Sequence, residues 1–167
     1  VITVVAKPAS CPGQCIYCPK GFNAPQSYTG MEPAIQRGIR NNYDPFSQTK
    51  DRLNQYKLTG HPSDKIEVII LGGTFLALEK DYQIWFVKRI FDALNRKESK
   101  TLLEAQKRNE SAKHRCVGLT IETRADYCQE EHINQMLKLG MTRVEIGVQS
   151  VYPDVLKKVK RGYGVDE

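Results

Sequence analysis

Three cysteines lie close together near the start of the chain, in the stretch SCPGQCIYCPKG at residues 10–21. Cys11, Cys15 and Cys18 have the spacing C-x3-C-x2-C, and no fourth cysteine is near them. Cysteine thiolates hold zinc and iron–sulfur clusters. A [4Fe–4S] cluster has four irons that normally take one cysteine each. Three thiolates from one loop would therefore leave one iron open to a small molecule that carries an amine and a carboxylate.

A structural zinc site is the main alternative for these cysteines, and it requires a fourth ligand. The candidates are Cys116, Cys128 and the three histidines at positions 61, 114 and 132. Cys128 follows a predicted strand near the same edge as the cysteine loop, whereas Cys116 precedes that strand. We favour the open cluster. A disulfide framework fits less well, because the chain has an odd number of cysteines, five.

The composition is that of a globular protein with one domain: 167 residues, of which 40% are hydrophobic and 26% charged. No run approaches the roughly 18 apolar residues of a membrane span, and the start VITVVAKPAS does not have the pattern of a signal peptide. We expect a cytoplasmic protein without a membrane partner, in which cysteines stay reduced. The net charge of +6 favours an anionic partner such as nucleic acid.

Four short stretches rich in Val and Ile are predicted strands, at residues 1–6, 65–71, 117–122 and 143–149. Helical patterns occupy residues 31–42, 46–58, 79–94 and 129–139, and Gly140 is expected to cap the last of these. Residues 97–115 are polar and charged, and they are predicted to form an exposed insertion. Strands that alternate with helices predict an α/β fold with a parallel sheet.

Two of the predicted helices have apolar residues at helical intervals. In the helix at 79–94 these residues are Trp85, Val87, Ile90, Phe91 and Leu94. In the helix at 129–139 they are Ile133, Met136 and Leu137. We expect both sets to face the core.

Each predicted strand runs directly into an unusual motif: the cysteines, then GGTF, ETRAD and finally QS. In parallel barrels the chemistry lies at the carboxyl ends of the strands. In the fourth strand Glu145, Gly147 and Gln149 share one face, and in the third strand Glu122 lies on the polar face. A strand in a closed, packed barrel is apolar on both faces. The polar face therefore predicts a barrel open enough to hold a polar ligand.

The loop CPGQCIYCP resembles the cysteine loop of radical S-adenosylmethionine (SAM) enzymes, where an aromatic residue commonly precedes the third cysteine. The resemblance implies a partial (β/α)6 TIM-like barrel. It also implies that Cys11, Cys15 and Cys18 bind three irons of a [4Fe–4S] cluster while SAM chelates the fourth. Tyr17 is predicted to lie against the bound adenine.

The motif GGTF resembles the second-strand glycine motif of these enzymes, whose backbone accepts hydrogen bonds from the amino group of the cofactor. This resemblance makes Gly72 and Gly73 cofactor-binding residues, with Thr74 assisting. The alternative is an ordinary strand-to-helix turn, in which glycine permits an irregular backbone.

Further cofactor contacts are predicted at the ends of the third and fourth strands. Glu122 suits ribose hydroxyls, and Arg124 suits a carboxylate or phosphate, although a surface ion pair is the alternative for both. The stretch VEIGVQS resembles the fourth strand of the coproporphyrinogen-type branch of radical enzymes, in which Glu145 and Gln149 would line the cofactor site. Arg161 is predicted to reach the cofactor carboxylate.

Longer stretches resemble the catalytic subunit of Elongator and its archaeal and bacterial relatives: 26–46, 68–75, 117–128 and 143–155. The resemblance implies a radical enzyme that acts on C5 of the wobble uridine of tRNA. SAM would be cleaved to a 5′-deoxyadenosyl radical, and acetyl-CoA would be the co-substrate. Other Elongator-type subunits are further expected partners.

The chain departs from that family in two ways and agrees with one branch of it. Ala125 stands where proline is expected, and the chain ends soon after the fourth strand. We therefore expect residues 1–167 to be the first four βα units of the radical SAM core, without the acetyltransferase domain that would follow. The short gap between the first two cysteines is typical of archaeal members.

Two other functions stay open from the sequence. The first is a radical SAM enzyme of another type, such as a methylthiotransferase or a relative of porphyrinogen oxidases. The second is a non-enzymatic tRNA-binding module held together by zinc. The predicted phosphate contacts are basic residues in two groups: Arg37, Arg40, Lys50, Arg52 and Lys57, then Lys157, Lys158 and Lys160.

Overall fold

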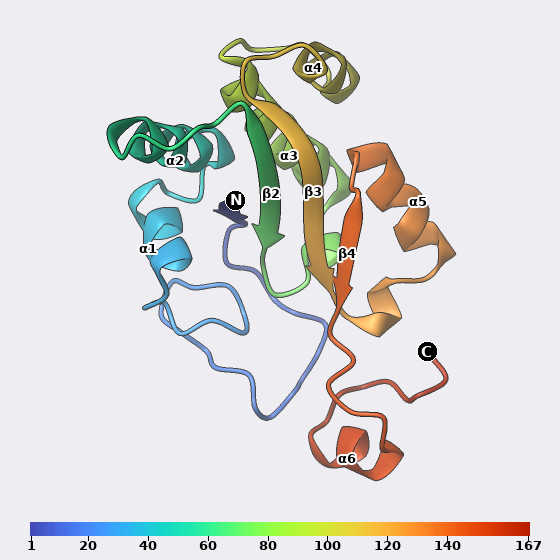
Figure 1. The fold of residues 1–167 in the computed structure, drawn as a ribbon. Helices are drawn as coiled ribbons and strands as arrows, with labels where there is room; N and C mark the ends of the chain where they lie inside the picture. Colours follow the sequence, from blue (N-terminus) through green and yellow to red (C-terminus); the bar gives the residue numbers. More distant parts are fainter.

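The computed structural model describes all residues from Val1 to Glu167. Four strands form one sheet in chain order, β1 (Ile2–Val5), β2 (Lys65–Leu71), β3 (Arg115–Thr123) and β4 (Arg143–Ile146). All three strand pairs are parallel, as the sequence predicts. The labelled arrows of β2, β3 and β4 in Figure 1 point the same way, toward the lower edge of the sheet. β1 and β4 are the two edges of this partial barrel.

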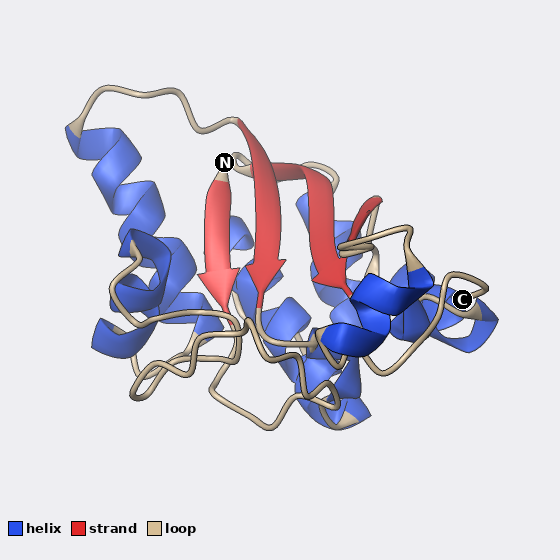
Figure 2. Cartoon of the chain, turned by 90° about the horizontal axis from the view of Figure 1, so that it is seen from below, coloured by secondary structure: helices blue, strands red, loops and turns tan.

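Six α-helices connect and cover the strands: α1 (Pro33–Arg40), α2 (Pro45–Leu58), α3 (Lys80–Asn95), α4 (Leu102–Asn109), α5 (Glu130–Leu139) and α6 (Pro153–Lys158). Two short 3-10 helices, Phe75–Ala77 and Ala125–Tyr127, follow β2 and β3. Figure 2, seen from below, shows the loops that gather around the carboxyl ends of the strands. None of the helices is both long and apolar enough to cross a membrane.

The two faces of the sheet differ in polarity because successive strand residues point to opposite sides. Val68 pairs in register with Leu119, and both are buried in the main core together with Phe86 of α3. On the other face Glu122 of β3 pairs in register with Glu145 of β4. The predicted polar face is therefore confirmed, and it leads to the carboxyl edge of the sheet.

The prediction of an exposed insertion at residues 97–115 is correct only in part: most of its residues are exposed, but it contains the helix α4, which packs against α3. Thr101 caps α4 by accepting a hydrogen bond from the backbone N–H of Glu104 at 3.1 Å. Ala105 is fully buried, and the buried side chain of Asn109 donates to the carbonyl oxygen of His114 at 3.1 Å. One small apolar residue and one bridging amide therefore attach one side of this charged helix to the rest of the fold.

The predicted apolar faces of α3 and α5 are correct only in part. In α3 four of the five predicted core residues are buried, namely Val87, Ile90, Phe91 and Leu94, but Trp85 is 40% exposed. In α5 Met136 is buried together with Leu139, whereas Ile133 and Leu137 are exposed. The buried residues of α5, Met136 and Leu139, are three positions apart. The buried side of this helix is therefore rotated away from the side that carries Ile133 and Leu137. Gly140 caps α5 at a φ of +84°, as predicted.

A buried amide stabilises the open edge of β1. Gln48 of α2 is fully buried, and its side chain accepts from the backbone N–H of Val5 and donates to the carbonyl oxygen of Val5, both at 2.9 Å. The other edge of β1 pairs with β2. The amide of Gln48 thus takes the place of a neighbouring strand at this residue.

We expect Gln48→Ala to lower the free energy of unfolding by about 2–5 kcal/mol, because both backbone groups of Val5 lose their buried partner. Urea denaturation measures the change. Asn54→Ala, an exposed change on the same helix, is the control and should stay within about 0.5 kcal/mol of the wild type. Equal unfolding midpoints for the two variants would contradict the role given to Gln48.

Candidate functional site

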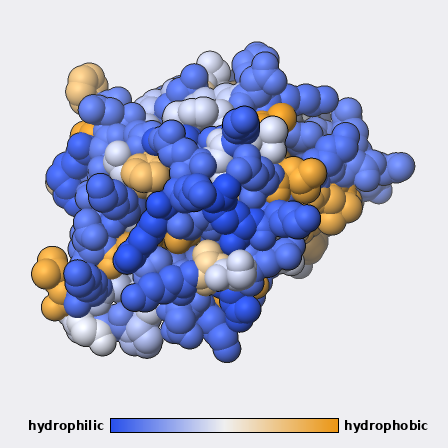
Figure 3. Space-filling view, turned by 90° about the horizontal axis from the view of Figure 1, so that it is seen from above, coloured by the Kyte–Doolittle hydropathy of each residue, from blue (hydrophilic) through white to orange (hydrophobic).

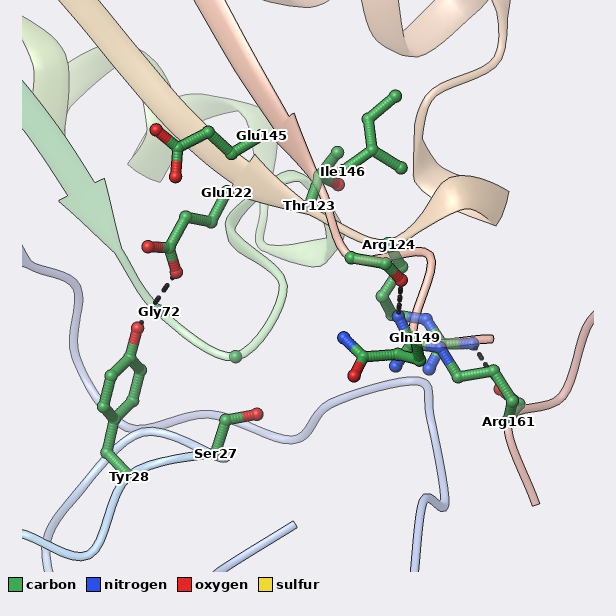
Figure 4. A pocket seen from close by; sticks show the side chains of 12 residues that line it. Ser27, Tyr28, Gly72, Glu122, Thr123, Arg124, Glu145, Ile146, Gln149 and Arg161 are labelled. Carbon is green, nitrogen blue, oxygen red and sulfur yellow. Dashed lines mark hydrogen bonds between the residues drawn. The ribbon is translucent and has the colours of Figure 1, made fainter. Parts of the chain in front are cut away.

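A polar cavity of about 360 Å³ lies at the carboxyl edge of β2, β3 and β4. It is lined by Ser27, Tyr28, Gly72, Gly73, Glu122, Thr123, Arg124, Glu145, Ile146, Gly147, Gln149 and Arg161. Figure 4 shows two carboxylates near one another on β3 and β4, with the side chains of Arg124, Gln149 and Arg161 gathered further along. The cavity therefore has an acidic part and a basic part.

The cavity brings together most of the residues that the sequence predicts to bind a cofactor: Gly72, Gly73, Glu122, Arg124, Glu145, Gln149 and Arg161. Thr74 and Tyr17 are not among its lining residues. Thr74 Oγ1 lies 3.3 Å from Cys11 Sγ, and Tyr17 accepts a hydrogen bond from Arg161 at 3.2 Å. Both therefore connect the cysteine loop to the surroundings of the cavity.

Five lining residues were not predicted: Ser27, Tyr28, Thr123, Ile146 and Gly147. Ser27 and Tyr28 come from the loop before α1, far in sequence from the strand ends. Their signal in the sequence was the stretch QSYTG, which carried part of the resemblance but gave no role to either side chain. A long loop that folds back over a sheet edge is not visible from strand periodicity.

The acidic part of the cavity is built by Glu122 and Glu145, which are register partners on adjacent strands. The Tyr28 hydroxyl donates to Glu122 Oε2 at 3.1 Å. Burial raises the pKa of Glu122, the hydrogen bond from Tyr28 opposes this rise, and the charge of Glu145 adds to it. Burial and the neighbouring carboxylate also raise the pKa of Tyr28. Two carboxylates in one recess offer acceptors for ligand hydroxyl or amine groups.

We expect Glu122→Gln to stabilise the chain at neutral pH. The pKa of Glu122 is higher in the folded chain than in the unfolded chain, so the folded state holds its proton more tightly between these two values. The contribution of this group to stability therefore falls as pH rises through that window. Glu122→Gln should therefore be more stable than the wild type at pH 7, and this difference in stability should disappear below about pH 4.

Thermal unfolding of both proteins between pH 4 and pH 8 measures this difference. Glu67→Gln is the matched control, because this exposed carboxylate lies on β2 outside the cavity. A wild type that is more stable than Glu122→Gln at pH 7 would contradict the effect of burial on Glu122.

The basic part of the cavity centres on Arg161, which is 6% exposed. Its guanidinium donates to the carbonyl oxygen of Gly147 at 2.6 Å, to the hydroxyl of Tyr163 at 2.7 Å and to Cys15 Sγ at 3.4 Å. Arg161 therefore joins the cysteine loop, the end of β4 and the segment after α6.

Arg124 is the second guanidinium beside the cysteine loop. It forms an ion pair with Asp126 at 2.8 Å, and its Nη1 lies 3.8 Å from Cys15 Sγ. Although burial alone would lower it, the hydrogen bond and the charge of Asp126 raise the pKa of Arg124. The guanidiniums of Arg124 and Arg161 both lie over the ring of Tyr163, with their central carbons 5.1 and 4.8 Å from the ring centroid, which is a cation–π arrangement. The partner of Arg124 is thus Asp126 and not Glu122, two residues before it.

The glycines of GGTF permit a close approach of two other segments. A side-chain carbon on Gly72 would lie 3.2 Å from the Cβ of Ala6, and one on Gly73 would lie 2.9 Å from the Cβ of Gln26. Both glycines therefore have a packing reason in this fold. They allow the chain after β1 and the loop before α1 to reach the edge of the cavity.

The prediction that β4 extends to Gln149 is wrong. β4 ends at Ile146, although the N–H of Gly147 still donates to the carbonyl oxygen of Thr123 at 2.9 Å. Beyond Gly147 the backbone turns, and Gln149 has a φ of +70°. A residue with a positive φ of this size cannot continue a β-strand. Gln149 nevertheless lines the cavity, reached by a turn and not by strand parity.

All five cysteines are free thiols. Cys18 Sγ lies 3.4 Å from the hydroxyl of Ser27, which lines the cavity. Cys116 and Cys128 pack against the main core instead. Burial raises the pKa of Cys116 to about 11. No group of three or more His, Cys, Asp or Glu side chains is placed so that it could hold a metal ion.

The predicted phosphate contacts divide by exposure. Arg37 is a correction, because it is buried and donates to the carbonyl oxygen of Thr3 at 2.7 Å, so it stabilises β1. Arg52 is half-buried, donates to Gln55 and lies over the ring of Tyr56. The others are exposed: Arg40, Lys50, Lys57, Lys157, Lys158 and Lys160.

Comparisons with known proteins point to one family. A model described as the Radical SAM superfamily matches residues 8–167. The chain is 59% identical over its full length to a tRNA uridine(34) acetyltransferase of Methanocaldococcus infernus. It is 46% identical over 99% of its length to human Elongator complex protein 3.

A solved structure of the archaeal Methanocaldococcus infernus Elp3 with an N-terminal deletion is also similar. It aligns with a TM-score of 0.76 and 62% identity, over 77% of this chain and 30% of that chain. The chain spans about a third of the length of the curated relatives, 32% in both cases reported above.

Proposed function

Since the chain belongs to the radical SAM superfamily, we propose that it is the SAM-cleaving core of an enzyme that modifies the wobble uridine of tRNA. The observation that carries the proposal is the polar cavity at the carboxyl edge of the sheet, with the three-cysteine loop beside it. Radical SAM family membership implies a [4Fe–4S] cluster and SAM as cofactors.

The residues near the cavity fit a [4Fe–4S] cluster. The cysteine loop offers three free thiols. Burial alone would raise the pKa of Cys15, but hydrogen bonds from Arg161 and Tyr17 and the charges of Arg161 and Arg124 outweigh it and lower the pKa. A lowered thiol pKa favours the thiolate, which is the metal-binding form. Cys11, Cys15 and Cys18 would hold the cluster.

The chemistry that such a cluster supplies is one-electron reduction of SAM, which gives methionine and a 5′-deoxyadenosyl radical. This chain would hold SAM through the acidic side chains of the cavity and through its arginine and amide side chains. Glu122 and Glu145 would accept hydrogen bonds from ribose hydroxyls or the amine, while Arg161 and Gln149 would bind the carboxylate. Gly72 and Gly73 would let the backbone approach the amino group, and Tyr17 would lie against the adenine.

The substrate that we propose is tRNA, modified at C5 of uridine 34 with acetyl-CoA as the co-substrate. The printed names of the relatives support the tRNA and the acetyl transfer. In this proposal residues 1–167 are the first four βα units of the radical SAM core, and an acetyltransferase domain outside them binds acetyl-CoA. Elongator-type subunits are the proposed protein partners, and the five free thiols agree with the reducing cytoplasm.

Exposed basic residues are the proposed tRNA contacts. Lys157, Lys158 and Lys160 lie on or directly after α6, in the same segment as Arg161, which lines the cavity. Phosphate contacts of this kind position a nucleic acid without reading its sequence. These lysines would hold the backbone of the RNA while its uridine enters the site.

The test is SAM cleavage by the anaerobically reconstituted full-length protein, with 5′-deoxyadenosine measured by chromatography. We expect turnover with a reductant, and a dependence on both tRNA and acetyl-CoA for the modified nucleoside. Cleavage that yields a modified product without acetyl-CoA would instead support another class of radical SAM enzyme. One bound zinc per chain, with no iron and no cleavage, would overturn the proposal in favour of a zinc-held binding module.

A further inference from the structure

A second concave surface lies away from the cavity, between α2, the end of α3 and the loops that lead into β2 and β3. It consists of two adjoining hollows of about 370 and 500 Å³, which share Leu53, Asn54 and Arg96. We call it the basic groove and define it by Lys50, Lys57, Arg96 and Lys113. The loops before β2 and β3 place one end of it at the edge where the strands begin.

Three separate elements supply the cations of the basic groove. Lys50 and Lys57 are seven residues apart on α2 and lie on the same side of that helix. Arg96 is the left-handed C-cap of α3, with a φ of +54°. Lys113 lies just before β3. Since these positions are far apart in sequence, their approach is a property of the fold.

The charge of the basic groove is not neutralised by the chain itself. Its lining contains no Asp or Glu. None of its four cations takes part in an ion pair, whereas Lys88, Arg89, Arg108 and Arg124 all do. All four cations are exposed. Like charges that line one concave surface without carboxylates raise the local concentration of an anionic ligand.

The surface around this end of the molecule is unlike a protein-binding surface. Figure 3, seen from above, shows a face that is mainly hydrophilic, with the hydrophobic residues in small separate groups. The core of a protein–protein interface is depleted of charged residues and enriched in aromatic ones. A nucleic acid backbone, by contrast, is bound by lysines and arginines that follow its phosphates.

We propose that the basic groove binds the phosphate backbone of RNA, at a part of the substrate remote from the nucleotide in the cavity. This inference rests on the proposed function, which makes tRNA the substrate. Lys50 and Lys57 are about 10 Å apart along the axis of α2. Lys50 lines one hollow, Lys57 and Lys113 line the other, and Arg96 lines both, so the cations are spread over the whole groove. Such a distribution suits an extended polyanion and not a single phosphate group. The groove would fix the orientation of the tRNA before chemistry.

The experiment measures binding of labelled tRNA to the full-length protein by fluorescence anisotropy, over a series of KCl concentrations. The groove variant is Lys57→Ala/Lys113→Ala. The matched control is Lys80→Ala/Lys138→Ala, which removes the same charge from exposed sites on α3 and α5. We expect the groove variant to bind tRNA about tenfold or more weakly, with a salt slope that is lower by about 2.

The outcomes separate this inference from the proposed function. A wild type that does not bind tRNA overturns both. A wild type that binds, with equal affinities and salt slopes for the groove variant and the control, overturns the groove alone. A labelled polyglutamate peptide is the comparison ligand. Loss of its binding with unchanged tRNA binding would assign the groove to an acidic protein and overturn the RNA proposal.

Discussion

Replacing Cys15 by alanine is expected to abolish cluster assembly, and with it SAM cleavage. Cys15 is the buried member of the three cysteines, and two guanidiniums lie at its sulfur, at 3.4 and 3.8 Å. Removal of its thiolate leaves two ligands for four irons, which is too few to retain a cluster of this type. Iron and sulfide content, the visible absorption of the cluster and its EPR signal measure the loss after anaerobic reconstitution.

Cys128→Ala is the control for this experiment. Cys128 is also a free thiol, half-buried, but it packs against the main core and not at the cavity. We expect this variant to assemble the cluster and to cleave SAM as the wild type does. Full iron content in Cys15→Ala would refute the assignment of the ligands. Loss of iron in Cys128→Ala would instead make Cys128 a fourth ligand.

Truncation of Arg161 is expected to have the second largest effect, because this residue joins three segments at the cavity. Arg161→Ala removes charge-assisted hydrogen bonds to Gly147 and Tyr163, and leaves the carbonyl oxygen of Gly147 with the Tyr163 hydroxyl, at 2.8 Å, as its remaining side-chain donor. We expect a loss of about 3–5 kcal/mol in the free energy of unfolding. We also expect SAM binding to weaken by at least about tenfold, since the guanidinium is the proposed partner of the carboxylate.

Arg161→Lys tests whether charge alone suffices. An ammonium cannot reproduce the planar fork that reaches Gly147, Tyr163 and Cys15 together, so we expect little recovery of stability. Lys158→Ala, an exposed change on α6, is the control and should leave both thermal stability and SAM binding unchanged. Calorimetry of SAM binding and thermal unfolding measure the two effects. Full SAM affinity in Arg161→Ala would exclude Arg161 from the cofactor site.

Local pattern predicted the strands well because each is a short run of β-branched residues between helical segments. The limits of β2 agree with the prediction at both ends, and those of β1 and β3 within two residues. The sequence pattern predicted exposure less well where the burial of a residue depends on partners that are distant in sequence. The charged segment 97–115 was predicted to be an exposed insertion, and most of it is exposed, but Ala105 and Asn109 of α4 are buried and hold this helix against α3. Arg37 was predicted to contact phosphate, yet it is buried and donates a hydrogen bond to the carbonyl oxygen of Thr3 in β1.

Local order along the chain is enough to predict which residue types meet at the cavity, because the carboxyl ends of parallel strands lie at one edge of a sheet. The spacing of the cysteines, the glycines after β2 and the polar strand faces that carry Glu122 and Glu145 all follow from local order along the chain. The groups that those residues contact are set by the tertiary fold. The contact of Tyr28 with Glu122 spans 94 positions, and that of Arg161 with Cys15 spans 146. Such contacts depend on how loops fold back over the sheet edge, and no periodicity in the sequence encodes that path.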